Sequence, residues 1–380
     1  MKITFITHIL SKKGGVEHAL MNLVEVLKSK GHEVEIISLV GPNDFDDELN
    51  SIHIKVHCLN LKSQWSIIPG LIKIIKIINQ QKPDILNAIN FFPMLYCALS
   101  KPFSQKPQRI VSYHNLGYET FPATTILKKL RKRADILLNK LMDGHTGVSK
   151  AVCDSYQHHL LIDDMRVIPN IVPQKKILSS LRTEKCTYEN LKNNNQKNII
   201  MAGRFVPEKG YQYMLLAMEI LVKKGLDINL EIYGDGPLRD EIEKEAIVLN
   251  LQKHIAFKGT VSHSTLHKQM LSANLLVLSS VSEGLPMAIA ESMVIGTPVV
   301  ASAVGGIPEM IEDGVSGKLV APKDPSALAA TIEELLINPQ LCKQLSDEGK
   351  IRINKKYSSE KVFEKIINYF DEIRKYKVSY

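Results

Sequence analysis

The chain has 380 residues, a net charge of +8 and 44% hydrophobic residues, which suffices for two globular domains that each have a core. No apolar stretch reaches the roughly 18 residues of a membrane-spanning helix, and the first ten residues read as a strand and not as a secretory signal. The five cysteines show no disulfide or metal spacing, so we expect a cytoplasmic protein.

The first half of the sequence alternates β-branched runs with helix-like runs. We expect strands at 2–8, 33–40, 52–58, 84–89, 109–114 and 165–169, and helices at 16–30, 65–79, 94–101 and 123–142. Ser149 is placed to cap a further helix at its N-terminus. This alternation is typical of an α/β domain built on a parallel sheet.

The alternation pauses and then restarts. Residues 173–196 are polar, charged and rich in asparagine, which predicts a linker or an exposed excursion. Strands are then expected at 198–202, 229–234, 255–258 and 275–279, and helices at 209–224, 238–249, 264–271 and 359–380, with Asp324 and Pro325 opening one more. Two α/β domains with a cleft at the carboxyl ends of their strands follow.

The most informative stretch is 282–311. It contains the apolar run Met287–Ile295, which predicts a helix ended by Gly296, with Pro286 at the first helical position. The backbone N–H groups of Gly284, Leu285, Met287 and Ala288 would surround the helix N-terminus, and such an end attracts phosphate.

Two carboxylates frame this helix. Glu283 precedes it and Glu291 lies eight positions later, a little over two turns along the helix, so both can line one cleft. The alternative is an ordinary helix with one capping and one exposed carboxylate.

Glu283 and Glu291, with seven residues between them, resemble the EX7E motif of retaining nucleotide-sugar glycosyltransferases of family four. The resemblance implies the GT-B fold, in which two Rossmann-like parallel-sheet domains face a central cleft. It implies an acceptor domain of residues 1–172 plus 359–380 and a donor domain of residues 173–358. It further implies that Glu291 binds the ribose of the nucleotide and that Glu283 is a catalytic residue beside the donor sugar.

Two cations follow the first strand of the second half. Arg204 and Lys209, flanked by Gly203 and Gly210, can hold a diphosphate at a helix N-terminus, although exposed charges that only favour solubility are the alternative. They match the GR…KG element of the same family. Phe257 and Lys258 are similar to the segment whose backbone meets the nucleotide base.

The first half contributes three candidates. Gly14 and Gly15 follow the first strand and open the first helix, so backbone can approach a phosphate or sugar closely, and the family has a similar glycine pair. Neither a GxGxxG fingerprint nor a Walker A run is present, which disfavours an NAD enzyme and a kinase. His114 ends a strand and resembles the active-site histidine of the family, which often has Asp where this chain has Asn115.

Basic residues gather in the predicted helix 123–142. The cluster is Lys128, Lys129, Arg131, Lys132 and Arg133, and apolar positions accompany it. Such a helix can lie on an anionic membrane surface, or it can be a solvated basic face over an apolar stripe packed in the core. Nucleic acid is not an expected partner, because no aromatic stacking platform accompanies the charge.

A metal is not expected either. Asp44 and Asp46 fit the DxD pattern of metal-dependent glycosyltransferases of another fold, but they lie in a polar loop and not directly after a buried strand. Arg204, Lys209 and the helix end can neutralise a diphosphate in place of a cation. We therefore expect no metal and no cofactor other than the nucleotide-sugar co-substrate.

The resemblance predicts a retaining, metal-independent glycosyltransferase. It would move a hexose or N-acetylhexosamine from a UDP-sugar to a sugar acceptor, lipid-linked in our expectation, in bacterial surface polysaccharide biosynthesis. Its place would be the cytoplasm or the inner face of the plasma membrane. The alternatives are a GDP-mannose-dependent mannosyltransferase, a UDP-sugar epimerase of the same fold and a non-catalytic partner subunit.

Overall fold

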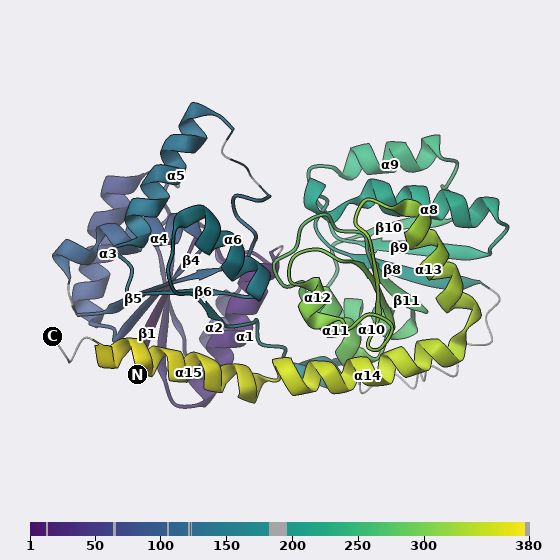
Figure 1. The fold of residues 1–380 in the computed structure, drawn as a ribbon. Helices are drawn as coiled ribbons and strands as arrows, with labels where there is room; N and C mark the ends of the chain where they lie inside the picture. Colours follow the sequence, from purple (N-terminus) through teal and green to yellow (C-terminus); the bar gives the residue numbers. More distant parts are fainter. Residues whose placement is uncertain are drawn as a thin grey trace. The chain divides into compact units, whose positions relative to one another are not determined.

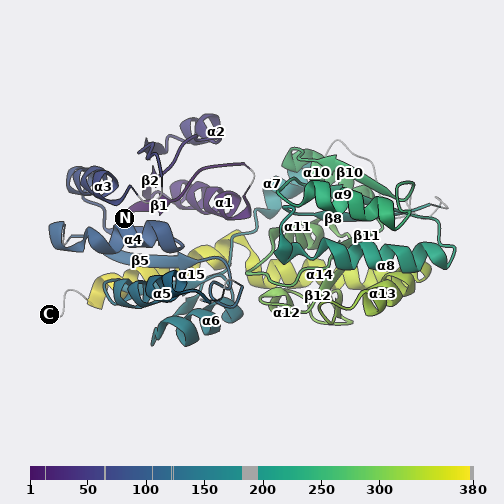
Figure 2. The same cartoon turned by 90° about the horizontal axis from the view of Figure 1, so that it is seen from above.

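The computed structural model describes residues 1–12, 14–63, 66–104, 106–120, 122, 124–181 and 196–376. The chain forms two compact units, Met1–Ile171 with Ser359–Tyr380, and Val172–Ser358. In each unit a parallel sheet lies between helices (Figures 1 and 2). The predicted α/β fold with two parallel-sheet domains is confirmed.

The first unit is built on a seven-stranded sheet of order β3-β2-β1-β4-β5-β6-β7. Its strands are β1 (Lys2–Thr7), β2 (Glu33–Ser38), β3 (Lys55–Cys58), β4 (Ile85–Ile89), β5 (Gln108–Tyr113), β6 (Gly144–Gly147) and β7 (Arg166–Val167). Its helices are α1 (Gly15–Ser29), α2 (Asp46–Ser51), α3 (Ile67–Gln81), α4 (Phe91–Leu99), η1 (Lys101–Phe103), α5 (Ile126–Asn139), α6 (Lys150–Leu160) and α15 (Ser359–Tyr376).

The core of this unit combines residues from both ends of the chain. Ile3 and Phe5 of β1 are fully buried, because helices cover both faces of a parallel sheet. Helix α15 lies along this unit (Figure 1). Its Val362, Ile366 and Phe370 pack into the same cluster. The last helix is therefore part of the first unit.

The second unit is built on a six-stranded sheet of order β10-β9-β8-β11-β12-β13. Its strands are β8 (Lys197–Ala202), β9 (Ile228–Tyr233), β10 (Ile255–Gly259), β11 (Leu275–Leu278), β12 (Val299–Ser302) and β13 (Lys318–Val320). Its helices are α7 (Gln174–Ser180), η3 (Pro207–Lys209), α8 (Tyr211–Lys223), α9 (Arg239–Val248), α10 (His263–Ser272), α11 (Met287–Ile295), α12 (Ile307–Met310), α13 (Pro325–Ile337) and α14 (Pro339–Tyr357).

The expected helix ends are confirmed where a cap was identified. Ser149 and Asp324 accept hydrogen bonds from the backbone N–H groups of Val152 and Ala327. Helix α11 spans Met287–Ile295 as predicted and ends at Gly296, whose φ of +96° favours glycine. Pro286, expected at the first helical position, is instead the N-cap.

Several local expectations were wrong. The predicted linker begins with helix α7, and its residues 182–195 lie outside the described residues, as do residues 65, 123 and 377–380 of the predicted helices. The polar loop with Asp46 is the first turn of α2. Strands β6, β12 and β13 and helices α12 and α14 were not predicted.

No helix among the described residues is both long and apolar enough to span a bilayer.

Candidate active site

The candidate donor site lies where β8 and β11 are neighbours in the sheet of the second unit. Strands β9 and β10 follow β8 on one side, and β12 and β13 follow β11 on the other. The loops after β8 and β11 therefore depart in opposite directions from the same edge, which is where open α/β sheets bind their ligands. The first loop carries Arg204 and Lys209, and the second carries Glu283.

A buried ion pair joins the two loops. The Nζ of Lys209 lies 2.6 Å from Oε1 of Glu283, and Ser280 Oγ donates to the same oxygen at 2.7 Å. Glu283 is only 8% exposed, so its charge requires such partners. Burial, together with the Glu283 carboxylate, raises the pKa of Tyr211. The structure thus brings two predicted site residues together.

Glycines allow the loop backbones to approach closely. At Gly234, with φ +135°, an added Cβ would lie 2.0 Å from the carbonyl oxygen of Gly203. At Gly210, with φ +59°, it would lie 2.3 Å from the carbonyl oxygen of Ser279. No other residue type fits either position without moving the loops that carry Arg204 and Glu283.

Arg204 contrasts with Lys209. Its side chain is exposed, and within the described parts of the chain no side chain or carbonyl hydrogen-bonds or ion-pairs with its guanidinium. Helix α11 begins just after Glu283, and its N-cap residue, Pro286, makes no capping hydrogen bond through its side chain. A planar cation and a positive helix end are therefore both available to an anionic ligand.

Glu291 lies on α11 and is 7% exposed. Its Oε1 lies 3.7 Å from Nδ1 of His263, and its Oε2 lies 3.7 Å from Nε2 of His267. Sequence reasoning missed these two histidines. The available signal was their spacing of four residues, with His267 inside the predicted helix 264–271 and His263 directly before it, since one helical turn places both on the same face.

The predicted base-binding segment is a strand at the edge of the sheet. The ring of Phe257 lies 6.2 Å from that of Phe205, and Lys258 pairs with Glu231 at 3.1 Å. The pairing of β10 with β9 shifts register between Phe257 and Gly259, which interrupts the ladder at Lys258.

In the first unit Gly14 is the N-cap of α1 and Gly15 is its first residue, so the helix begins one residue before the predicted start at 16. A Cβ on Gly14 would lie 1.8 Å from Oε2 of Glu17, whereas one on Gly15 would meet open space. Asp44 accepts a hydrogen bond from the Lys12 N–H, and Asp46 accepts one from Asn43. Within the described chain these two aspartates do not belong to a cluster with metal-ligand geometry.

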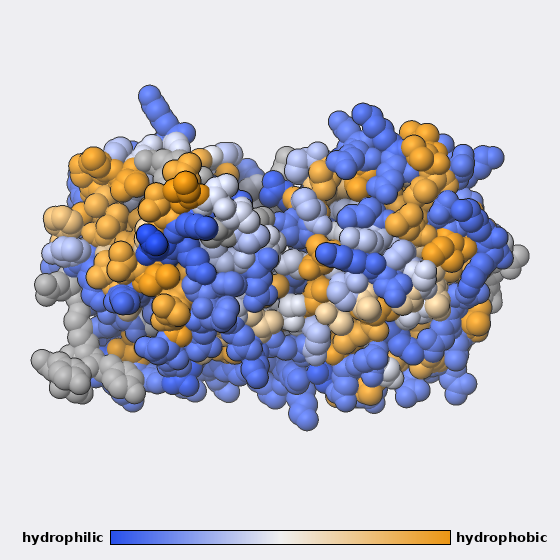
Figure 3. Space-filling view, turned by 45° about the horizontal axis from the view of Figure 1, so that its top comes forward, coloured by the Kyte–Doolittle hydropathy of each residue, from blue (hydrophilic) through white to orange (hydrophobic). Residues whose placement is uncertain are grey.

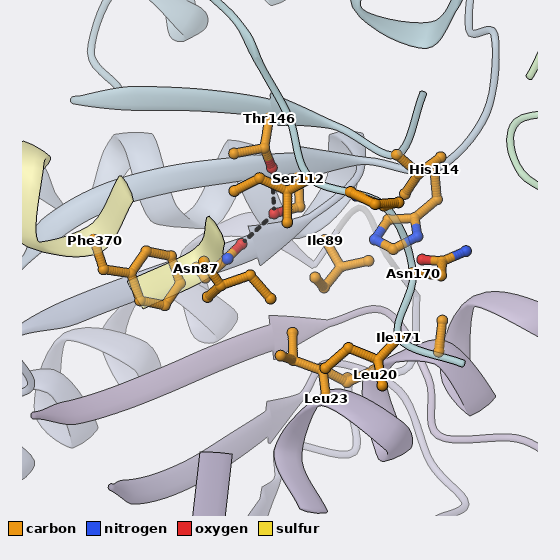
Figure 4. A pocket seen from close by; sticks show the side chains of 15 residues that line it. Leu20, Leu23, Asn87, Ile89, Ser112, His114, Thr146, Asn170, Ile171 and Phe370 are labelled. Carbon is orange, nitrogen blue, oxygen red and sulfur yellow. Dashed lines mark hydrogen bonds between the residues drawn. The ribbon is translucent and has the colours of Figure 1, made fainter. Parts of the chain in front are cut away.

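His114 stands in the wall of a small cavity of about 40 Å³ inside the first unit (Figure 4). Ser112 donates to Asn87 at 2.9 Å and Thr146 donates to Ser112 at 2.8 Å, while Leu20, Leu23 and Phe370 supply apolar walls. This volume is sufficient for ordered water. Burial lowers the pKa of His114 to about 4, despite a hydrogen bond with Asn170, so the imidazole is neutral at pH 7.

The predicted site residues thus fall into two sets. Arg204, Lys209, Phe257, Lys258, Glu283, Gly284, Leu285, Met287 and Glu291 belong to the second unit, and Gly14, Gly15 and His114 belong to the first.

The two parallel-sheet domains have the GT-B fold, as similarity to solved structures shows. The HepE protein of Anabaena in complex with UDP-glucose superposes with a TM-score of 0.81 at 19% identity, covering 98% of this chain and 100% of that one. Residues 13–176 match the profile described as Glycosyltransferase Family 4, and residues 184–352 match that of Glycosyl transferases group 1. The chain belongs to the glycosyltransferase family that these two profiles together describe.

Two relatives that align over nearly their whole length are also named glycosyltransferases. An uncharacterized glycosyltransferase of Haemophilus influenzae is 23% identical over 96% of this chain and 98% of its own length. The capsular polysaccharide biosynthesis glycosyltransferase CapM of Staphylococcus aureus is 22% identical over 93% of each chain.

Proposed function

We propose that this glycosyltransferase transfers a hexose or N-acetylhexosamine from a UDP-sugar to a saccharide hydroxyl, with retention of configuration and without a metal at the diphosphate. The observation that carries the proposal is the arrangement at the β8 and β11 loops. There Lys209 is held against buried Glu283, beside the exposed Arg204 and the uncapped start of α11. This arrangement offers positive charge to a leaving diphosphate.

The charges suit the departure of a nucleoside diphosphate. The planar guanidinium of Arg204 can hold two phosphate oxygens, and Lys209 retains donors beyond the one that Glu283 occupies. The α11 N–H groups add the partial positive charge of a helix end. The acceptor oxygen can then bond to the anomeric carbon on the face that the diphosphate leaves, while the leaving phosphate oxygen takes the acceptor proton, which gives retention.

Two carboxylates serve different parts of the donor in this scheme. Glu291 accepts hydrogen bonds from the ribose hydroxyls, a task suited to a group that only accepts. Glu283 is held in place by Lys209 and Ser280 and accepts a hydrogen bond from a hydroxyl of the donor sugar. It is a polar contact near the reacting carbon and is not assigned as a nucleophile. His114, neutral at pH 7, can donate or accept one hydrogen bond in the first unit.

The nucleotide is tested by thermal shift. The solved HepE complex contains UDP-glucose, which supports UDP as the first choice. GDP is the second nucleotide to be tested. A ligand that binds only the folded state at 100 times its Kd adds about 2.7 kcal/mol to the free energy of unfolding. We expect UDP to raise the melting temperature more than GDP. If no nucleoside diphosphate changes it, the donor assignment fails.

Configuration and reaction type are tested together by NMR. With a UDP-α-sugar and a saccharide acceptor, the product should keep the α configuration, and an inverted product would contradict the proposed mechanism. UDP-sugar incubated alone should give no isomer, because an isomer would indicate an epimerase.

The name of CapM supports a place in surface polysaccharide assembly, for which the acceptor is proposed to be lipid-linked. Helix α5 supports contact with a membrane. Its Ile126, Leu127 and Leu130 are 77%, 78% and 53% exposed, next to the basic cluster. Figure 3 shows hydrophobic and hydrophilic side chains mixed over this face of the first unit. We infer that α5 lies on an anionic bilayer surface, with apolar side chains inserted among the headgroups.

Vesicle sedimentation tests this inference. The protein should bind vesicles that contain phosphatidylglycerol more strongly than neutral ones, and Leu127→Ser and Lys128→Gln should each weaken binding. Lys223→Gln, which removes a 71% exposed lysine of the second unit, is the matched control. Equal binding by all three variants would place the contact elsewhere.

A further inference from the structure

Three side chains that can each offer a metal-ligand atom converge in the second unit. They are His263 and His267 on α10 and Glu291 on α11, and their ligand atoms all lie within 4.8 Å of one another. The two histidines are four residues apart on one helix, so they project from the same face. Both His–Glu separations are 3.7 Å.

A hydrogen bond fixes the tautomer of His267. Ser180 Oγ lies 2.6 Å from the carbonyl oxygen of Ile177 and 3.0 Å from Nδ1 of His267. The hydroxyl has one proton, which it donates to Ile177, so Nδ1 of His267 must carry a proton and donate it to Ser180. In the neutral imidazole, which is the form that binds a metal, Nε2 then presents a lone pair.

That lone pair faces a carboxylate. His267 is 5% exposed, and within the described chain its Nε2 has no hydrogen-bond partner. Across 3.7 Å stands Oε2 of Glu291, which is also an acceptor. Two buried acceptors that face each other are unfavourable unless a cation or a donor lies between them.

The geometry suits a tetrahedral transition-metal ion. Zinc bonds of about 2.0–2.2 Å to nitrogen and oxygen place neighbouring ligand atoms roughly 3.3 Å apart, so small side-chain rotations suffice. Ser180 supplies the outer partner that orients a metal-bound histidine. Two imidazoles with one carboxylate favour Zn²⁺ or Co²⁺ over Mg²⁺ or Ca²⁺, and water can fill the fourth position.

We propose that His263, His267 and Glu291 bind one divalent transition-metal ion and that this ion competes with the nucleotide for Glu291. The competition rests on the proposed function, in which the ribose hydroxyls use the same carboxylate, whereas metal binding does not depend on it. The ion is an inhibitor in this scheme and takes no part in transfer. By linkage, bound zinc lowers the affinity for the nucleotide by the same factor as bound nucleotide lowers the affinity for zinc.

Metal binding is tested on the untagged full chain after treatment with EDTA and buffer exchange. Calorimetric titration with ZnCl₂ should give one ion per chain, and Co²⁺ should show the visible absorption of a tetrahedral site. His263→Ala and His267→Ala should each lower the affinity for zinc at least 100-fold, and Ser180→Ala should lower it about 10-fold. His158→Ala is the control, because exposed His158 also lies beside a second histidine, His159, with ring centroids 5.0 Å apart.

The outcomes separate the two claims. No zinc binding, or unchanged binding in both histidine variants, would overturn the site. His263 is partly exposed, so its variant should fold normally, which circular dichroism checks. Zinc that binds with the same affinity with and without saturating UDP would overturn the competition. If UDP itself does not bind, the proposed function fails while the zinc titration still decides the site.

Discussion

Helices α11 and α5 place their residues in opposite ways. In α11, seven of nine residues are buried, from Ile289 to Ile295, and the carboxylate Glu291 is one of them. In α5, the buried residues are Asp135 and Asn139, while Ile126, Leu127, Leu130 and Leu137 are exposed. One helix is apolar and enclosed, and the other turns polar groups inward and apolar groups outward.

The inward face of α5 explains this inversion. Asp135 accepts hydrogen bonds from Tyr118 at 2.9 Å and from Asn139 at 2.9 Å, and Asn139 accepts one from Tyr113 at 2.9 Å. This network fixes the helix to the sheet through polar contacts, so its exposed leucines are not needed for packing. An apolar stripe therefore indicates an apolar neighbour without identifying it, and here the described chain does not supply one.

Matched truncations to alanine in α11 and α5 should give the largest difference between the two helices. Ile289→Ala removes a fully buried side chain of α11 and should cost about 2–5 kcal/mol of unfolding free energy. Leu127→Ala removes a side chain that is 78% exposed and should change it by less than about 0.5 kcal/mol. Urea denaturation measures both, and equal costs would mean that α5 is covered in solution.

The two carboxylates near α11 should separate catalysis from binding. Glu283→Gln should lower kcat roughly 100-fold or more, the scale of a lost transition-state contact, with UDP affinity within a few fold. Glu291→Gln should mainly lower the affinity for UDP. Steady-state kinetics and calorimetry check this pair, and a Glu283→Gln enzyme that loses UDP but keeps its turnover would reverse the two roles.

Removing either cation should weaken catalysis by a smaller amount. We expect Arg204→Ala and Lys209→Ala each to cost about 1.5–3 kcal/mol in kcat/KM, the scale of a hydrogen bond to a charged group. Lys209→Ala also leaves buried Glu283 without its cation and should lower the stability of the fold. Arg204→Ala removes an exposed side chain and should leave stability unchanged. Near-native kcat/KM in both variants would place the diphosphate elsewhere.

The polar face of α5 should appear as a pH dependence of stability. Burial raises the pKa of Asp135 to about 6 from the ordinary 3.8. The folded state therefore binds the Asp135 proton more tightly than the unfolded state does. The resulting contribution to the free energy of unfolding is complete below pH 4 and is lost as pH rises through 6. The free-energy difference between Asp135→Asn and the wild type should shift in favour of the variant over this range. A difference independent of pH would contradict the raised pKa.

Chelation should have the smallest effect. Transfer should survive EDTA, because positive side chains and a helix end meet the diphosphate. Loss of transfer in EDTA and its recovery with Mn²⁺ would revive Asp44 and Asp46 as metal ligands.

What could be predicted followed from local chemistry. Gly296 and Pro286 delimit α11, and Ser149 and Asp324 cap their helices through their own side chains. Strand β6, with two glycines in four residues, has no alternating pattern to detect, and α2 opens with an acidic run without apolar periodicity. Such segments are defined by the sheet and the packing around them.

The site was predictable as a set of residues and not as a set of contacts. The charges of Arg204 and Lys209 beside glycines indicated an anion, and Glu283 and Glu291 stood out by their spacing. The pairing of Lys209 with Glu283 joins residues 74 positions apart, and the contact of Ser180 with His267 joins residues 87 apart. Neither can be read from a local pattern, because both depend on how the strands are ordered.

The place of α15 has a consequence for synthesis on the ribosome. Val362, Ile366 and Phe370 belong to the core of the unit that is translated first, yet they are made after Ser358, the last residue of the other unit. The core of the second unit consists of residues that are all made before α15. The first unit must wait with an apolar surface uncovered, which makes the nascent N-terminal half the part most in need of a chaperone.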